Sequence, residues 1–140
     1  MSTTTTADGV GLWWERSGDG EVVLLVPGRG DCTDRYPSTF TDRLLAAGLS
    51  TLRYDPRDTG LSSDGGDAYT VRTMADDAVA VLDASGVDAA HVVGMSLGGL
   101  LAVDLAARHA ARVRSLTFVS AMSPDPAAGF GDALFDESID

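Results

Sequence analysis

The residues that point most directly to chemistry are 94–98, which read Gly-Met-Ser-Leu-Gly and form a G-x-S-x-G motif. This spacing is typical of a nucleophilic serine on a sharp turn from a strand into a helix, where side chains two positions to either side would collide. Glycine at 94 and 98 removes that collision. The motif predicts that the Ser96 hydroxyl attacks an electrophilic carbon. The alternative is an ordinary strand–glycine–helix turn in another α/β protein.

The residues on both sides of Ser96 have the pattern that such a turn requires. Residues 89–95 form a short apolar run, which is typical of a strand buried on both faces of a parallel sheet. The following helix is expected to direct backbone N–H groups and the positive end of its dipole toward Ser96. It is apolar around most of its circumference, as a helix packed inside a domain is. Its large apolar residues are Leu97, Leu100, Leu101, Val103 and Leu105.

The remaining elements are expected to alternate between strands and helices, the order that builds a parallel sheet covered by helices. An early strand is expected at 10–16, at an antiparallel edge, and Thr70 is a suitable N-cap for a helix that ends at Gly86. Further strands are expected at 21–26, 49–54 and 113–120, and a further helix at 38–47. The predicted fold is α/β, a mostly parallel twisted sheet with helices on both faces.

Length and charge limit the classes of protein and partner. The chain has 140 residues, which fits one domain with a sizeable core. Its net charge of −11 argues against a nucleic-acid partner and against an anionic membrane surface. No lysine and no G-x-G-x-x-G occur, which excludes a phosphate-binding P-loop and disfavours a dinucleotide site. No run approaches the roughly 18 apolar residues of a membrane span, so we expect no membrane partner.

Few residues are available for a metal or redox centre. Two distant histidines and the single Cys32 offer no ligand cluster, so neither a metal nor an organic cofactor is expected. Cys32 cannot form a disulfide within the chain, which is compatible with a cytoplasmic location, and we expect it to be a small buried apolar residue. Residues 1–9 are polar and lack the features of a signal peptide, and we expect them to be flexible.

Two further segments have a recognisable spacing. Residues 24–30 read Leu-Leu-Val-Pro-Gly-Arg-Gly, an aliphatic strand that runs into a glycine-containing turn. Residues 55–62 read Asp-Pro-Arg-Asp-Thr-Gly-Leu-Ser. Together with the G-x-S-x-G motif, these segments resemble the α/β-hydrolase family over residues 12–120. Pro27 stands where that family usually has a histidine, and Asp58 stands where glycine is more common.

The resemblance implies a serine hydrolase site. The backbone N–H groups of Arg29 and Leu97 would form an oxyanion hole, which stabilises the negative charge of a tetrahedral intermediate. The loop with Asp58 is similar to that of the aclacinomycin-methylesterase-like subgroup, which implies an esterase acting on a small-molecule carboxylic ester, although the fold hosts many reactions. Asp55 and Arg57 are expected to form a structural ion pair that shapes the loop, with a catalytic role as the alternative.

The family orders its catalytic residues as serine, then an acid, then a late histidine. At about 3.3 Å per residue, His91 lies about 16 Å before Ser96 on the same predicted strand. At about 1.5 Å per residue, His109 lies about 20 Å along the helix. Proton transfer requires about 3 Å, so we expect the base to come from outside this chain and His109 to be solvated or to cap the helix. Asp125 is the candidate acid, with a solvated turn residue as the alternative.

The resemblance implies only the N-terminal half of the usual domain, truncated after the strand that follows the Ser96 helix. The expected divisions are a flexible segment at 1–9, a partial hydrolase domain at 10–122, and an acidic tail or start of a lid at 123–140. The strand at 113–120 would then be an uncovered edge that carries Leu116, Phe118 and Val119. We therefore expect self-association, pairing with a complementing chain, or marginal stability.

Three functions are compatible with these observations. The first is a cofactor-free esterase with Ser96 as nucleophile and a small-molecule ester as its partner. The second is a non-catalytic or incomplete member of the fold, which binds or associates without turnover. The third keeps the fold but changes the reaction, for example to that of a haloperoxidase or a dehalogenase.

Overall fold

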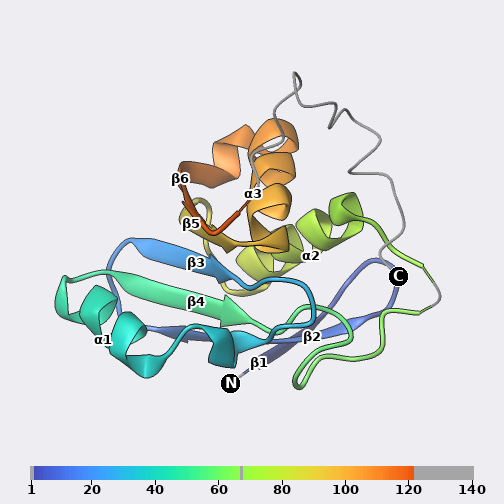
Figure 1. Cartoon of the computed structure of the whole chain (residues 1–140), viewed down its shortest axis with the longest axis horizontal. Coiled ribbons are helices and arrows are strands. Elements are labelled where there is room, and N and C mark those ends of the chain that lie inside the picture. Colours follow the sequence, from blue (N-terminus) through green and yellow to red (C-terminus); the bar gives the residue numbers. More distant parts are fainter. Residues whose placement is uncertain (1, 67, 122–140) are drawn as a thin grey trace.

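A computed structural model describes residues 2–66 and 68–121 of the chain (Figure 1). These residues form one six-stranded sheet with the strand order β1-β2-β4-β3-β5-β6. In chain order the strands and α-helices are β1 (Ser2–Thr5), β2 (Gly11–Ser17), β3 (Val22–Val26), α1 (Ser38–Ala46), β4 (Ser50–Tyr54), α2 (Val71–Ala84), β5 (Ala90–Met95), α3 (Leu97–Arg108) and β6 (Val113–Val119). Short 3-10 helices lie at Thr33–Arg35 and Ala110–Arg112.

The sheet is mostly parallel, as the alternation of strands and helices predicts. β4, β3, β5 and β6 are parallel neighbours, and β2 pairs antiparallel with β4. All five residues of β3 are aliphatic and buried, which suits a central strand whose two faces are both covered. The carboxyl ends of β3 and β5 lie side by side, where Val26 pairs with Gly94. The loops that follow these two strands therefore meet at one edge of the sheet.

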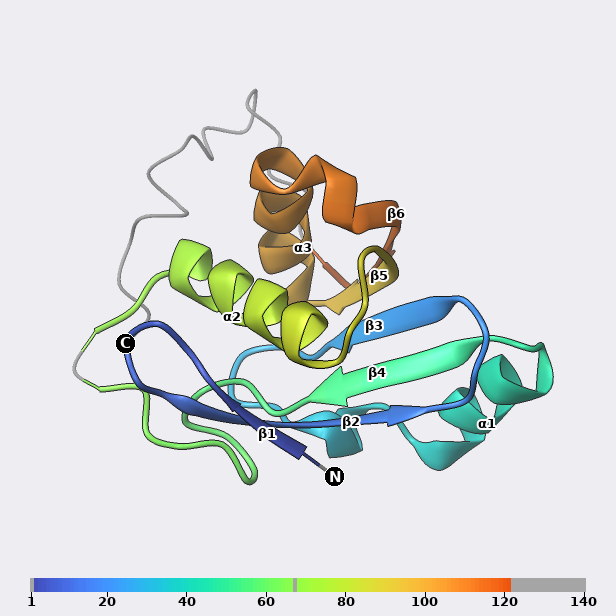
Figure 2. The same cartoon turned by 180° about the vertical axis from the view of Figure 1, so that it is seen from behind.

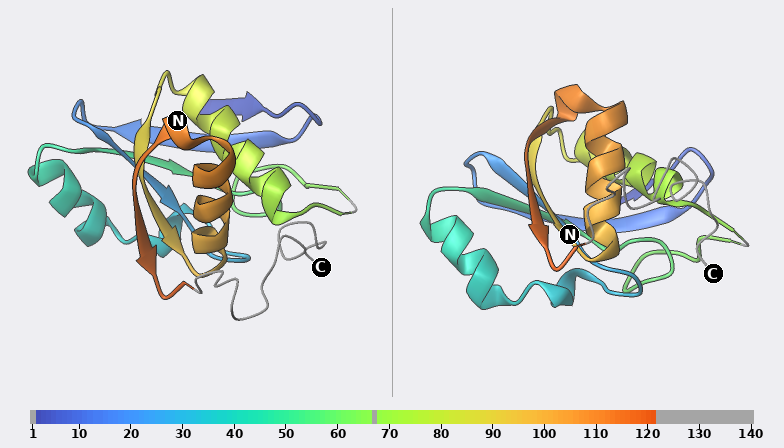
Figure 3. Two further views of the ribbon diagram at one scale, coloured as in Figure 1. Left: turned by 90° about the horizontal axis from the view of Figure 1, so that it is seen from above. Right: turned by 45° about the horizontal axis from the view of Figure 1, so that its top comes forward.

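Helices cover both faces of this sheet. Alternate residues of a strand point to opposite faces, so Val22, Leu24 and Val26 join the core against α2 and α3. Val23 and Leu25 pack in a second core with residues of α1. Figures 1 and 2 show α1 on one side of the sheet and α2 with α3 on the other, and Figure 3 shows the same layers from two further directions. The predicted α/β fold is confirmed.

The ends of α1 and α2 follow from the local sequence. The Thr70 hydroxyl accepts the backbone N–H of Thr73 at 3.3 Å, and the Thr73 hydroxyl accepts that of Thr70 at 3.4 Å, which together cap α2. Gly48 and Gly86 follow α1 and α2 with φ of 79° and 67°. Glycine adopts these left-handed values without strain. The two helices begin and end close to the predicted positions.

The N-terminal segment differs from the expectation of a flexible stretch at 1–9. Ser2–Thr5 form β1, which pairs antiparallel with β2 from Ser2 opposite Trp14 to Thr5 opposite Gly11. Threonine is β-branched and favours an extended backbone, and the free side of β2 supplies the hydrogen bonds. The antiparallel edge of the sheet is therefore β1 and not, as predicted, the strand that follows it.

The opposite edge of the described sheet is β6, which is paired on one side only, with β5. Its Phe118 residue is 47% exposed, which is unusual for a large apolar residue. The strand predicted at 113–120 is thus present and lies at an edge. Within the described residues, no helix has the length and apolar character needed to cross a bilayer.

Candidate functional site

Ser96 lies, exposed, on the sharp turn that joins β5 to α3. Its backbone has φ 50° and ψ −119°, an unfavourable conformation for any residue with a Cβ. Two glycines make the turn possible. A Cβ on Gly94 would lie 2.4 Å from the carbonyl oxygen of Gly98, and a Cβ on Gly98 would lie 2.5 Å from that of Val26. The strand–serine–helix turn that the G-x-S-x-G spacing predicts is present.

β6 holds this turn in place. The backbone N–H of Ser96 donates to the carbonyl of Val119 at 3.1 Å, and the N–H of Gly99 donates to the carbonyl of Ser96 at 2.9 Å. The first bond continues the parallel register of β5 and β6, in which Met95 pairs with Val119. The motif alone does not reveal this anchor, because the partner lies on a strand that follows the intervening helix.

The turn after β3 lies against Ser96. A Cβ on Gly28 would lie 3.3 Å from the Cβ of Ser96, so a larger residue at position 28 would crowd the serine. The Tyr36 hydroxyl donates to the carbonyl of Val26 at 2.8 Å and lies 3.2 Å from that of Val93. Tyr36 therefore ties together the ends of the two strands that carry the site, a role that its sequence position does not indicate.

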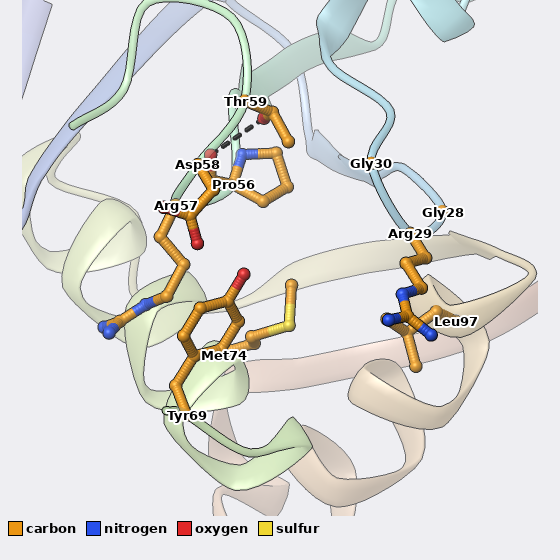
Figure 4. Close-up of a pocket in the computed structure, with 10 residues that line it drawn as sticks. All are labelled: Gly28, Arg29, Gly30, Pro56, Arg57, Asp58, Thr59, Tyr69, Met74 and Leu97. Carbon is orange, nitrogen blue, oxygen red and sulfur yellow. Dashed lines mark hydrogen bonds between the residues drawn. The ribbon is translucent and has the colours of Figure 1, made fainter. Parts of the chain in front are cut away.

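Two cavities meet beside the serine turn. The first, of about 150 Å³, is bordered by the loops after β3 and β4 and by Tyr69 and Met74 (Figure 4). The second, of about 250 Å³, includes Ser96 in its wall. Arg29 and Leu97 border both cavities. The Leu97 N–H is in the first turn of α3, where amides lack an intrahelical acceptor, and within the described residues the Arg29 N–H donates to no protein acceptor.

The loop after β4 is organised by Asp55 and Arg57, which bind different partners. Asp55 accepts the backbone N–H groups of Thr33 at 2.8 Å and Leu61 at 2.9 Å, which joins this loop to the segment after β3. Arg57 donates from Nε and Nη2 to the two carboxylate oxygens of Asp77 on α2, each at 2.7 Å. The predicted Asp55–Arg57 ion pair is therefore wrong, because the packing of α2 brings Asp77 to the guanidinium.

Arg57 is the centre of a charge cluster beside the first cavity. The side chains of Arg57 and Asp77 are 1% and 3% exposed, and the half-exposed Asp8 lies 3.0 Å from Arg57. Burial by itself lowers the pKa of Arg57, but the hydrogen bonds to Asp77 and Asp8 raise that pKa above its ordinary value. Burial raises the pKa of Asp77, and Arg57 opposes this rise. In the sequence, this cluster is indicated only by Asp77, a carboxylate next to Ala78 on the apolar face of a helix.

A family model described as alpha/beta hydrolase fold matches residues 21–140. The chain belongs to the alpha/beta hydrolase fold family. It is 46% identical over 117 residues to rhodomycin D methylesterase DauP of a Streptomyces species, covering 80% of this chain and 39% of that protein. It is 42% identical over 106 residues to the provisionally named carbamate hydrolase RutD of Variovorax paradoxus, covering 75% of this chain and 40% of that protein.

Solved structures show the same fold. A hydrolase from Pseudomonas aeruginosa superposes with a TM-score of 0.81 at 29% identity, covering 91% of this chain and 49% of that one. This alpha/beta hydrolase chain therefore spans about two fifths of the length of the curated relatives it matches and about half of that structure.

Both histidines of this alpha/beta hydrolase lie away from the serine turn. The ring of His91, on β5, lies 2.7 Å from the Ser115 hydroxyl and 3.6 Å from the Glu21 carboxylate. His109 follows the last residue of α3, and its Nε2 lies 3.4 Å from the Asp76 carboxylate. Neither ring borders the two cavities. Both histidines therefore lie at other places in the fold than the serine turn, in agreement with the separation expected from strand and helix geometry.

Three further expectations concern this alpha/beta hydrolase. Cys32 is half-buried rather than fully buried, because it lies in the loop after β3 and not within the strand. In the part of the chain that the structure describes, no group of three or more His, Cys, Asp or Glu residues is placed to hold a metal ion. The candidate acid Asp125 and the tail or lid expected at 123–140 lie outside the described residues.

Proposed function

We propose that Ser96 is the nucleophile of an esterase-type hydrolase acting on a small-molecule carboxylic ester. The observation that carries this proposal is the backbone of Ser96, with φ 50° between glycines that permit the turn. A side chain kept in such a conformation, exposed beside a cavity, points to a reactive role. The 46% identity to a protein named as a methylesterase supports an ester as the substrate class.

The described residues supply defined parts of the proposed reaction. The Ser96 Oγ attacks the ester carbonyl carbon while a general base takes the hydroxyl proton. The carbonyl oxygen becomes an oxyanion that accepts hydrogen bonds from the backbone N–H groups of Arg29 and Leu97. The positive N-terminal end of the α3 dipole stabilises the negative charge of this oxyanion. Cleavage of the ester C–O bond releases the alcohol, which takes the proton from the base. Water then attacks the acyl-serine and releases the carboxylic acid.

The general base of this proposal comes from outside these 140 residues. His91 and His109 are bound at other places in the fold, and the match covers about two fifths of the curated relatives. A carbamate is the second candidate substrate class, favoured by the 42% identity to a protein named as a carbamate hydrolase. The carbonyl carbon of a carbamate would be attacked by the same Ser96 hydroxyl, and its oxygen would accept hydrogen bonds from the same two backbone N–H groups.

A fluorophosphonate probe tests the nucleophile, because the probe reacts with an activated serine hydroxyl. With the base supplied by a second subunit or a further segment, we expect the intact mass of the folded protein to increase by one adduct, and peptide mapping to place that adduct on Ser96. Ser96→Ala is expected to abolish labelling. Ser120→Ala is the matched control and is expected to label like the unmodified chain, because Ser120 borders the same cavity and also has a positive φ, of 48°. A folded protein that is supplied with the base and forms no adduct on Ser96 contradicts the proposal.

A substrate panel separates the remaining functions. With the base supplied, we expect acid release from small methyl esters that is lost in Ser96→Ala, with carbamates as the second class in the same assay. Halide release from haloalkanes, or halogenation that requires peroxide, without ester hydrolysis would favour a different reaction on this fold. Binding of esters without any turnover or labelling would favour a non-catalytic member.

A further inference from the structure

One wall of the first cavity carries a carboxylate that the proposed reaction does not use. Asp58 lies in the loop after β4 and borders the cavity. Figure 4 shows Asp58 and Tyr69 on one side of this cavity, and Arg29 and Leu97 on the other. A group bound between the two sides would thus extend from the proposed oxyanion donors toward Asp58.

The backbone of Asp58 has a left-handed conformation, with φ 65°. Glycine adopts this conformation freely, whereas a residue with a Cβ is strained there, although Asp and Asn tolerate it better than most. Strained residues cluster at ligand-binding and active sites. The presence of Asp rather than Gly at this position therefore points to a use for the side chain.

The carboxylate of Asp58 is held by the backbone and lies near Tyr69. The backbone N–H of Gly65 donates to its Oδ1 at 2.6 Å, and Figure 4 shows the Tyr69 hydroxyl directed toward Asp58. Tyr69 and the N–H of Gly65 lower the pKa of Asp58, so the carboxylate is ionised at neutral pH. Tyr69 is itself held by Arg57, whose guanidinium carbon lies 5.1 Å from the centre of the ring. The acceptor is therefore charged and preorganised.

The Asp58 carboxylate has acceptor capacity left for a ligand. An ionised carboxylate offers about four lone-pair sites, and the N–H of Gly65 occupies one of them. Asp58 is an exposed residue on the wall of a cavity, so its remaining sites are open to a bound molecule. A ligand carboxylate would be repelled there, while a donor group would gain a charge-assisted hydrogen bond.

We propose that Asp58 is a specificity-determining residue, whose carboxylate accepts a hydrogen bond from a hydroxyl or ammonium group that the substrate carries away from its ester carbonyl. The substrate class is then a hydroxyl- or amino-substituted ester rather than a purely aliphatic one. This inference rests on the proposed function for the identity of the reacting group, but the hydrogen bond itself requires no catalytic base.

Binding of matched esters tests the proposal. The probes are three methyl esters of equal chain length that end in a hydroxyl, an ammonium or a methyl group. They are titrated into Ser96→Ala protein, in which turnover is blocked, and dissociation constants are taken from the shifts of the Gly65 and Tyr69 amides in proton–nitrogen NMR spectra. We expect at least one donor-bearing ester to bind about tenfold more tightly than the methyl-terminated ester, the size expected for one charge-assisted hydrogen bond.

Two substitutions of Asp58, each made in the Ser96→Ala protein, change the hydrogen-bond acceptor and are expected to keep the fold. Asp58→Gly suits the left-handed backbone and is expected to bind all three esters equally. Asp58→Asn tolerates the same backbone and keeps one carbonyl oxygen, so it is expected to retain preference for the hydroxyl ester and to lose preference for the ammonium ester. Tight binding of the ammonium ester with weak binding of the hydroxyl ester would identify a cation as the recognised group. Equally tight binding of both esters would show that Asp58 recognises any hydrogen-bond donor.

Three results would overturn the assignment of Asp58: equal binding of all three esters, no saturable shift with any of them, or a donor preference that survives in Asp58→Gly. The outcome is independent of the adduct experiment on the unmodified chain. A donor preference that depends on Asp58, together with a Ser96 that never labels, would retain the binding role of Asp58 and reject the proposed reaction.

Discussion

The guanidinium of Arg57 is bound by both carboxylate oxygens of Asp77, with a donor–acceptor distance of 2.7 Å in each hydrogen bond. Both side chains are almost inaccessible to water. The pair fastens the loop that borders the first cavity to α2. Removal of Arg57 would leave Asp77 as a buried, uncompensated charge, and removal of Asp77 would leave Arg57 with only the half-exposed Asp8.

We expect Asp77→Asn to lower the free energy of unfolding by about 3 kcal/mol, because breaking the buried ion pair leaves the desolvated guanidinium with only the half-exposed Asp8 as counter-charge. Equilibrium unfolding in urea, followed by circular dichroism, measures this loss. Asp76→Asn is the matched control: it lies on the same helix, its side chain is 57% exposed, and its expected cost is below about 1 kcal/mol. Similar losses in the two variants would contradict the importance of burial.

Asp8 is expected to make the stability of the protein depend on acid pH. Its pKa is lowered from the ordinary value of 3.8 by hydrogen bonds from Arg57 and Thr6. The stability that it contributes is therefore fully present above the unfolded pKa and is lost as pH falls through the lower folded pKa. We expect Asp8→Asn to cost less than about 1 kcal/mol at neutral pH, because Asp8 is half-exposed.

Urea unfolding of the unmodified chain and of Asp8→Asn at a series of pH values checks this expectation. The difference between the two free energies of unfolding should be constant near neutrality and should shrink as the pH falls below about 4. A difference that is the same at all pH values would show that Asp8 does not act through its charge.

The serine turn is expected to tolerate no side chain at Gly94. A Cβ added at this position would lie 2.4 Å from the carbonyl oxygen of Gly98, a backbone atom. Gly94→Ala should therefore lower the free energy of unfolding by about 3 kcal/mol or more through overpacking. Gly86→Ala is the control, because Gly86 has a positive φ but open space around it, and backbone strain alone should cost about 1 kcal/mol. Thermal and urea unfolding measure both losses, and a milder effect at Gly94 than at Gly86 would contradict the steric argument.

The β6 edge is expected to associate with a second copy of the chain. It is paired on one side only within the described sheet, and Phe118 on it is 47% exposed. Unpaired strand edges with apolar side chains favour pairing between chains. Light scattering should show a mass that rises with concentration, and Phe118→Lys should reduce that rise. A monodisperse monomer at all concentrations would contradict this expectation.

The sequence by itself determined the features that depend on neighbours along the chain. Gly94 specifies the serine turn because the steric conflict it relieves, with the carbonyl oxygen of Gly98, lies within a few residues. Thr70 specifies the start of α2 because its capping partner is three residues away. The continuous aliphatic run of β3 indicates a strand covered on both faces. These are short-range consequences of backbone geometry and hydrophobic periodicity, so they are readable without the fold.

Only the tertiary structure decided which distant groups meet. The order of the sheet places Val119 on the amide of Ser96, and the packing of α2 gives Arg57 the partner Asp77 rather than Asp55. Likewise, β1 forms because the far side of β2 is free to pair, although its residues are polar. Local pattern cannot specify such contacts, because each is set by strand order and helix packing, which bring together residues that the chain itself keeps apart.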